Sequence, residues 1–137
     1  MNPVYEDAAF KLQSEFIFND GSSLSLGDNL SGGEWESGID YQVLLIDGVP
    51  VPSDLKDLYE NVNLQVLVRG EKLEEDRKVY SRAYEVMRFF LNLPENTDLN
   101  GCIYKGFEQE SGLLQLGKDS NERFTYSFNL STYRGVL

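Results

Sequence analysis

The fold is decided by residues 62–91, which begin Val62-Asn-Leu-Gln-Val-Leu-Val-Arg69-Gly70 and continue into a charged stretch with regularly spaced apolar residues. In the first part, apolar side chains alternate with mainly polar ones, which is the period of two expected of a β-strand with one buried face. Gly70 permits a sharp turn after this strand. From Glu71 onward the apolar period becomes that of a helix, and Pro94 disfavours its continuation. The sequence therefore predicts a strand, a short turn and a long amphipathic helix.

The apolar stripe of this helix is expected to face the core. Its members are spaced at about one helical turn and are Val79, Ala83, Val86, Met87 and Phe90. Three more residues flank the stripe, and we expect them to pack in the core rather than to bind a ligand: Tyr80, Tyr84 and Leu91. Acidic residues crowd the first turns, where they complement the helix dipole.

The remaining helices and strands are predicted from weaker sequence patterns. Residues 3–19 carry apolar residues at helical spacing, and residues 53–59 could form a single helical turn. Further strands are expected at 41–46, at 102–108 with pairing resumed over 113–116, and at 123–134. The last strand alternates apolar residues with hydroxyl and amide residues, so one face of the sheet should be solvated. The sequence predicts one α+β domain over residues 1–137, with a largely antiparallel sheet of about four strands and two main helices packed on one face.

Residues 20–40 are rich in glycine and serine and are predicted to form a flexible loop. The only tryptophan, Trp35, lies in this loop between Glu34 and Glu36. A lone loop aromatic commonly packs against its own domain, and the alternative is that it anchors a partner protein. The acidic residues of the loop do not follow the spacing of a calcium-binding loop, so we expect no metal site there.

Composition excludes several classes of protein. The chain has no histidine and a single cysteine, Cys102, so histidine-dependent catalysis, histidine metal ligation and multi-cysteine zinc sites are ruled out. The net charge of −11 argues against binding to nucleic-acid phosphates and to anionic membranes. No apolar run resembles a signal peptide or a membrane span, and we expect synthesis and folding in a cytosol.

No arrangement of residues indicates an active site. Acid pairs such as Glu108/Glu110 could in principle hydrolyse glycosides, but with 23 acidic residues such pairs arise by chance. No serine has a histidine to activate it, and Gly101 and Gly106 are not followed by the Lys-Ser/Thr of a phosphate-binding loop. We therefore expect neither enzymatic activity nor a cofactor, and composition alone indicates a soluble acidic interaction protein.

A series of short motifs carries a resemblance to a known family. Their order is Leu64-Gln-Val-Leu-Val-Arg69-Gly70, Tyr84-Glu-Val-Met-Arg-Phe-Phe-Leu91, Asn100-Gly101-x-x-Tyr104, Leu114-x-Leu-Gly-Lys-Asp119-x-Asn-Glu-Arg123 and Tyr126-Ser-Phe-Asn-Leu130. This order resembles the minor capsid or tail terminator proteins of long-tailed double-stranded DNA phages. The resemblance covers roughly residues 41–134. Lys118 stands where the family pattern has arginine, and the loop at 20–40 has no counterpart in that pattern.

The resemblance implies a structural role. Such proteins form a ring, usually a hexamer, that caps the tail tube, stops its polymerisation and offers a surface to the head-completion or neck protein. DNA would pass through the ring without specific binding, and the protein would reside in the virion at the head–tail junction after synthesis in the host bacterial cytoplasm. Contacts with partners are expected from the loop, through Trp35, Glu34 and Glu36, and from the family motifs, through Arg69, Lys118, Asp119 and Asn121.

Two other interpretations remain open. One is a neighbouring head-completion or minor capsid role. The other is a monomeric acidic adaptor or inhibitor domain, which self-association would distinguish from a ring protein.

Overall fold

A computed structural model describes residues 2–35, 41–48 and 59–135. The described residues form two helices and seven strands, in the order α1 (Val4–Glu15), β1 (Leu30–Gly32), β2 (Gln42–Asp47), β3 (Tyr59–Arg69), α2 (Asp76–Leu91), β4 (Thr97–Leu99), β5 (Cys102–Gln109), β6 (Leu114–Lys118) and β7 (Phe124–Gly135).

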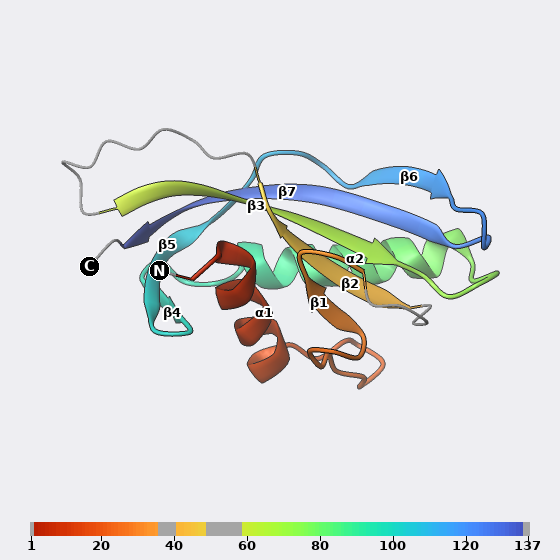
Figure 1. The fold of residues 1–137 in the computed structure, drawn as a ribbon, viewed down its shortest axis with the longest axis horizontal. Coiled ribbons are helices and arrows are strands. Elements are labelled where there is room, and N and C mark those ends of the chain that lie inside the picture. Colours follow the sequence, from red (N-terminus) through yellow and green to blue (C-terminus); the bar gives the residue numbers. More distant parts are fainter. Residues whose placement is uncertain (1, 36–40, 49–58, 136–137) are drawn as a thin grey trace.

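The centre of the sheet is the antiparallel pair β3–β7, the two long strands of Figure 1. The pairing is continuous from Tyr59 opposite Gly135 to Arg69 opposite Thr125. Apolar residues face each other on one side of this pair, for example Val66 opposite Phe128, both of them fully buried. The alternation that predicted the two strands is therefore confirmed, and it sets which face becomes the core.

The predicted sheet of about four antiparallel strands is wrong. The described strands form one curled, mixed sheet of seven, in the order β1-β2-β3-β7-β5-β4, with β6 beside β7 as well. β1 runs parallel to β2, whereas the other pairs are antiparallel. β5 and β6 pair one after the other along the same edge of β7, which is long enough for both partners. The α+β class is as predicted.

Both helices contribute to one core on the apolar face of the sheet (Figure 1). The α1 residues in it are Val4, Ala8, Ala9 and Leu12, and the α2 residues are Val79, Ala83, Val86, Met87 and Phe90. The α2 stripe is thus the predicted one. Tyr80 and Tyr84 are 44% and 45% exposed, so their predicted place in the core is wrong. A tyrosine beside an apolar stripe can instead keep its hydroxyl edge in water.

The loop regions also differ from the prediction. α1 ends at Glu15, because Phe16 is extended (φ −85°, ψ 134°). Residues 20–40, predicted to be an irregular loop, contain β1 and a bridge between Ile17 and Ser23 that begins just before them. Residues 36–40 of that loop, and residues 53–58 of the helical turn predicted at 53–59, lie outside the described residues.

The second face of the sheet is less exposed than its polar sequence predicts. On this face, Gln42 is fully buried, Leu44 is 3% exposed, Ser127 is 5% exposed and Arg69 is 8% exposed. Tyr133, further along β7 on the same face, is 53% exposed. The prediction of a solvated face is therefore wrong around these four residues and correct toward the end of β7.

Candidate functional site

Trp35 lies on Arg69 at one end of the sheet. The guanidinium carbon of Arg69 is 4.2 Å from the centre of the indole ring, a cation–π contact of roughly 0.5–2 kcal/mol. Arg69 is the last residue of β3, and its side chain also donates to Gln42 Oε1 at 3.3 Å. Trp35 is half-buried and Glu34 beside it is exposed, so this contact joins the segment after β1 to the sheet while leaving part of the indole accessible.

The turn between β6 and β7 is organised by Asp119. Its Oδ1 accepts from the backbone N–H groups of Asn121 at 2.9 Å and Arg123 at 3.0 Å, and its Oδ2 accepts from Arg123 Nε at 2.9 Å. Desolvation alone would raise the pKa of Asp119, but these hydrogen bonds favour the charged carboxylate and hold the pKa below its ordinary value. Lys118 lies over the Phe124 ring at 5.0 Å. Asp119 thus holds a fixed turn with exposed polar groups.

The turn and the Trp35–Arg69 contact lie at the same end of the molecule. Arg69 pairs with Thr125 near the start of β7, and Lys118 pairs with Phe124 next to it. The residues before α2 are tied to the turn by Gly70 N–H to Phe124 O at 2.9 Å and by Leu73 N–H to Glu122 O at 3.2 Å. The sheet therefore brings together Trp35, Arg69 and the Lys118–Asn121 turn, while Glu36 lies outside the described residues.

Two residues at this end hold an unfavourable backbone conformation. Leu73 and Glu122 have φ values of 63° and 58°, in the left-handed region that disfavours residues with a Cβ. The two residues are joined by the hydrogen bond from the backbone N–H of Leu73 to the backbone oxygen of Glu122. The geometry of the turn is thus imposed by the pairing around it rather than by local preference.

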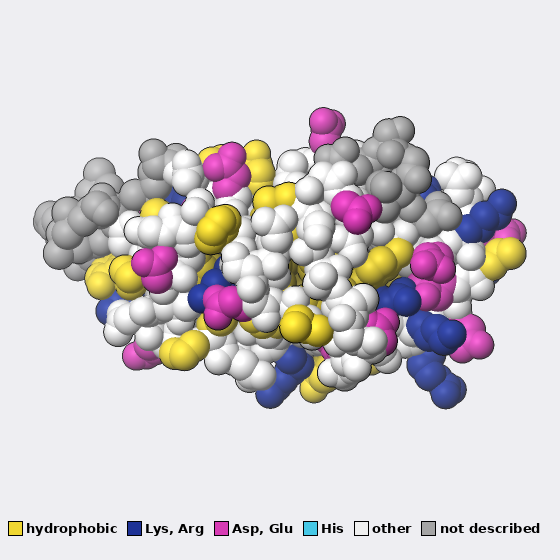
Figure 2. Space-filling view, turned by 90° about the horizontal axis from the view of Figure 1, so that it is seen from below, with side chains coloured by type: hydrophobic (Ala, Val, Ile, Leu, Met, Phe, Trp, Pro, Cys, Tyr) yellow, Lys and Arg dark blue, Asp and Glu magenta, His cyan; other side chains and the backbone are white. Residues whose placement is uncertain are grey.

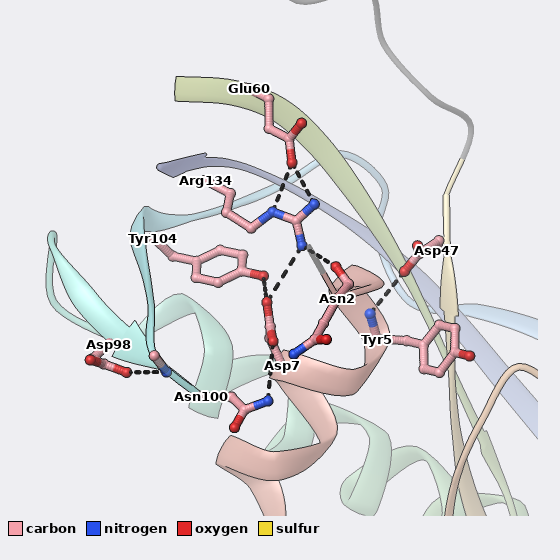
Figure 3. Close-up of polar contacts among 10 residues, drawn as sticks. Asn2, Tyr5, Asp7, Asp47, Glu60, Asp98, Asn100, Tyr104 and Arg134 are labelled. Atoms are coloured by element: carbon pink, nitrogen blue, oxygen red, sulfur yellow. Dashed lines mark hydrogen bonds and ion pairs between the residues drawn. The ribbon is translucent and has the colours of Figure 1, made fainter. Parts of the chain in front are cut away.

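A second polar cluster, at the opposite end of β3 and β7, was not predicted (Figure 3). Asp7 of α1 is fully buried and accepts hydrogen bonds from the Tyr104 hydroxyl at 2.5 Å and from Asn100 Nδ2 at 3.4 Å. Arg134 of β7 approaches Asp7 at 3.5 Å and donates to Glu60 through Nε at 2.8 Å. Burial and the hydrogen bond to Asp7 raise the pKa of Tyr104.

This cluster joins α1 to β3, β5, β7 and the turn between β4 and β5. Arg134 Nη1 also donates to the backbone oxygen of Asn2 at 2.6 Å, so one guanidinium connects the start of α1 with the strand ends. Desolvation opposes the charge of Arg134, but the carboxylate of Glu60 raises its pKa, which keeps the guanidinium charged. The cluster is closed to solvent at Asp7 and Tyr104, both fully buried. Its geometry fits a structural clamp rather than a site that receives a substrate.

The sequence contained a signal for this clamp. Asp7 interrupts the apolar stripe of residues 3–19, and Arg134 stands on the apolar side of the alternation in β7. A charged residue on a buried face needs a partner of opposite charge.

Among the described residues, neither end holds a cluster of metal-ligating side chains. Over residues 2–35, 41–48 and 59–135, no group of three or more acidic or cysteine side chains is placed to hold a metal ion. In the same part of the chain, no helix is long and apolar enough to cross a membrane. What the Trp35–Arg69 end offers is a conformationally fixed surface on which the half-buried Trp35 covers Arg69 and the turn at Lys118–Asn121 exposes charged and amide groups.

Comparison with known proteins adds no relative. No protein-family model matches the sequence, and no curated protein sequence matches it significantly.

Proposed function

We propose that this chain is the tail terminator of a long-tailed double-stranded DNA phage. It would be a subunit of a ring, hexameric as the resemblance implies, that caps the tail tube and joins it to the head-completion protein. It would act at the head–tail junction of the virion after synthesis in the bacterial cytoplasm. The proposal rests on the order of the family-like motifs in the sequence.

One observation from the structure supports the proposal. The motif ending in Arg69-Gly70 and the motif containing Lys118-Asp119 are far apart in the sequence, yet they meet at one end of the sheet. Trp35, which no motif contains, lies on the same end through Arg69. Aromatic and arginine side chains are the residue types that contribute most to protein–protein binding. A single surface formed in this way supports a docking role for that end.

The charge of the chain supports the expected passage of DNA. With a net charge of −11, an assembled ring would repel phosphates rather than retain them. DNA could then move through the channel without specific binding.

The first test is the native mass of the purified protein, measured by light scattering across protein and salt concentrations. We expect a ring-sized species, alone or after addition of tail tubes assembled from the same phage's tube protein. Electron microscopy of the tubes should show the ring at one end, and tubes made in its presence should stop growing. A chain that is monomeric under all these conditions, and absent from tube ends, would contradict the proposal and favour a monomeric adaptor.

The second test addresses the docking end. Trp35→Ala should leave the chain folded, because Trp35 is only half-buried, and should weaken attachment to tubes by roughly tenfold or more. Trp35→Phe keeps a ring over Arg69 and serves as the matched control. Equal attachment of wild type and Trp35→Ala would exclude Trp35 from the docking surface.

A further inference from the structure

One exposed face of α2 carries a strip of arginine and tyrosine side chains. The strip is defined by Arg77, Tyr80, Ser81, Tyr84 and Arg88, all exposed. At about 100° per residue these five positions fall within roughly 100° of arc on the helix surface, and they extend over about 16 Å of its length. This face lies opposite the buried stripe of Val79, Ala83 and Phe90.

The strip is rigid in its middle. The rings of Tyr80 and Tyr84 stack with centres 6.4 Å apart and planes 16° apart. Tyr80 also meets Tyr126 of β7 edge-on at 5.5 Å, and the Tyr126 hydroxyl donates to Asp76 Oδ1 at 2.7 Å. The two exposed rings therefore need little ordering on binding, which reduces the entropic cost of forming an interface.

The arginines at the two ends of the strip are available to a partner. Within the described residues, Arg77 makes no hydrogen bond or ion pair, and Arg88 only donates to Asn92 Oδ1 at 3.3 Å. Figure 2 shows basic side chains gathered toward the end of the molecule where α2 begins. Residues 69–82 and 117–123 include seven basic and six acidic side chains, so the excess negative charge of the chain lies elsewhere.

The chemistry of the strip fits an acidic protein surface. Arginine and tyrosine are enriched in protein–protein interfaces. The whole chain carries a charge of −11 and repels any polyanion, a second copy included, so the partner must offer carboxylates locally, where they contact the arginines. A second copy of this chain offers such a local site.

A complementary hollow lies beyond the other end of α2. It is lined by the β5 backbone at Gly106, where φ is +99°, and by the side chains of Leu93, Glu95, Lys105, Phe107, Glu108, Ser131, Thr132 and Tyr133. Glu95 and Glu108 are exposed, and neither forms a hydrogen bond or ion pair through its side chain with another described residue. Lys105 donates to Asn96 Oδ1 at 2.8 Å and lies over the Tyr59 ring at 4.6 Å, whereas the two carboxylates are free and can receive an arginine.

We propose that a second copy of this chain docks head to tail on the strip, with Arg77 of one copy in the Glu95/Glu108 hollow of the next. Arg77 lies near the start of α2 and the hollow follows its end, so the two surfaces belong to a heterologous contact. Heterologous contacts close into rings when the rotation between neighbours allows it. The inference rests on the proposed ring and names its subunit interface.

The test is a charge exchange measured by light scattering and analytical ultracentrifugation. Arg77→Glu should raise the concentration needed for half-assembly about tenfold or more, because it places like charges in contact. Lys72→Glu changes the net charge equally at an exposed position off the strip and should change assembly less than about twofold. The Glu95→Arg/Glu108→Arg variant should also fail to assemble alone, whereas an equimolar mixture with Arg77→Glu should assemble, since every contact then joins opposite charges.

Each outcome decides the inference. Assembly by Arg77→Glu at the wild-type concentration would overturn the inference and leave the ring proposal intact. Failure of the mixture to assemble would overturn the head-to-tail pairing. Binding of a single-stranded DNA oligonucleotide by wild type, lost in Arg77→Glu, would reassign the strip to nucleic acid. A wild type that never assembles, even on tail tubes, would overturn both the inference and the proposed function.

Discussion

Replacing Arg134 by methionine should destabilise the protein strongly. The substitution keeps most of the side-chain volume but removes the guanidinium that contacts Glu60, Asp7 and the Asn2 backbone. Removing one partner of a buried ion pair costs about 3–5 kcal/mol, because the other charge stays buried. The Glu60 side chain is 25% exposed and can be rehydrated, and Asp7 keeps the Tyr104 hydrogen bond. We therefore expect the lower end of the range, about 3 kcal/mol.

Urea unfolding followed by circular dichroism measures this loss. The midpoint should fall by roughly 1–2 M, and Lys72→Met, at an exposed position, should change the free energy of unfolding by less than about 0.5 kcal/mol. Asp7→Asn removes the stranded charge, so the Asp7→Asn/Arg134→Met double variant should be less destabilised than the sum of the single variants by at least about 1 kcal/mol. A loss below about 1 kcal/mol for Arg134→Met, or additive effects within about 0.5 kcal/mol, would refute the clamp.

Three further predictions concern the docking end. Gly70→Ala would place a Cβ 2.4 Å from Val79 Cγ2, so we expect the free energy of unfolding, measured by heat or urea, to fall by about 1–3 kcal/mol. Gly112→Ala is the control and should be nearly neutral, because its nearest neighbour lies at 3.8 Å. Equal effects of the two substitutions would contradict the close approach of Val79 to Gly70. Glu122→Gly should relieve the positive φ of 58° and stabilise by roughly 0.5–1 kcal/mol, whereas Glu122→Ala should not. The pKa of Asp119 lies below its ordinary value of 3.8 in the folded chain, so its charge stabilises above that pH and the stabilisation is lost as the pH falls through the folded pKa. The stability advantage of wild type over Asp119→Asn should therefore shrink on acidification, and an advantage independent of pH would contradict the role of the charge.

The strand, turn and helix of residues 62–91 could be predicted because their periods are visible within the segment itself, although β3 begins earlier, at Tyr59. Two strands, Leu30–Gly32 and Thr97–Leu99, have three residues each and are too short to show a period. The sequence predicts one strand at 102–108 whose pairing resumes over 113–116, whereas the structure has two strands, β5 and β6, which pair with different parts of β7. The number of strands therefore depended on long-range pairing, which the sequence does not display.

The sequence suggests which residues belong to the candidate site, but it does not show how they are arranged. Trp35 was singled out by its rarity, and Arg69 and Asp119 by their motifs. That these residues share one end follows from the registers of β3, β6 and β7. Apolar spacing places Tyr80 and Tyr84 in the core, although both are exposed, because spacing alone does not say how far around the helix the buried surface reaches.

The position of β7 has a consequence for synthesis on the ribosome. The strand in the middle of the sheet is formed by residues 124–135, and its partners β3, β5 and β6 all precede it in the sequence. Until those residues have left the exit tunnel, β3 lacks β7, the strand that pairs with it along its full length. The earlier strands then expose apolar surface. Folding of this domain should thus wait for its last strand, so a premature stop before residue 124 would yield aggregation-prone chains rather than a smaller folded product.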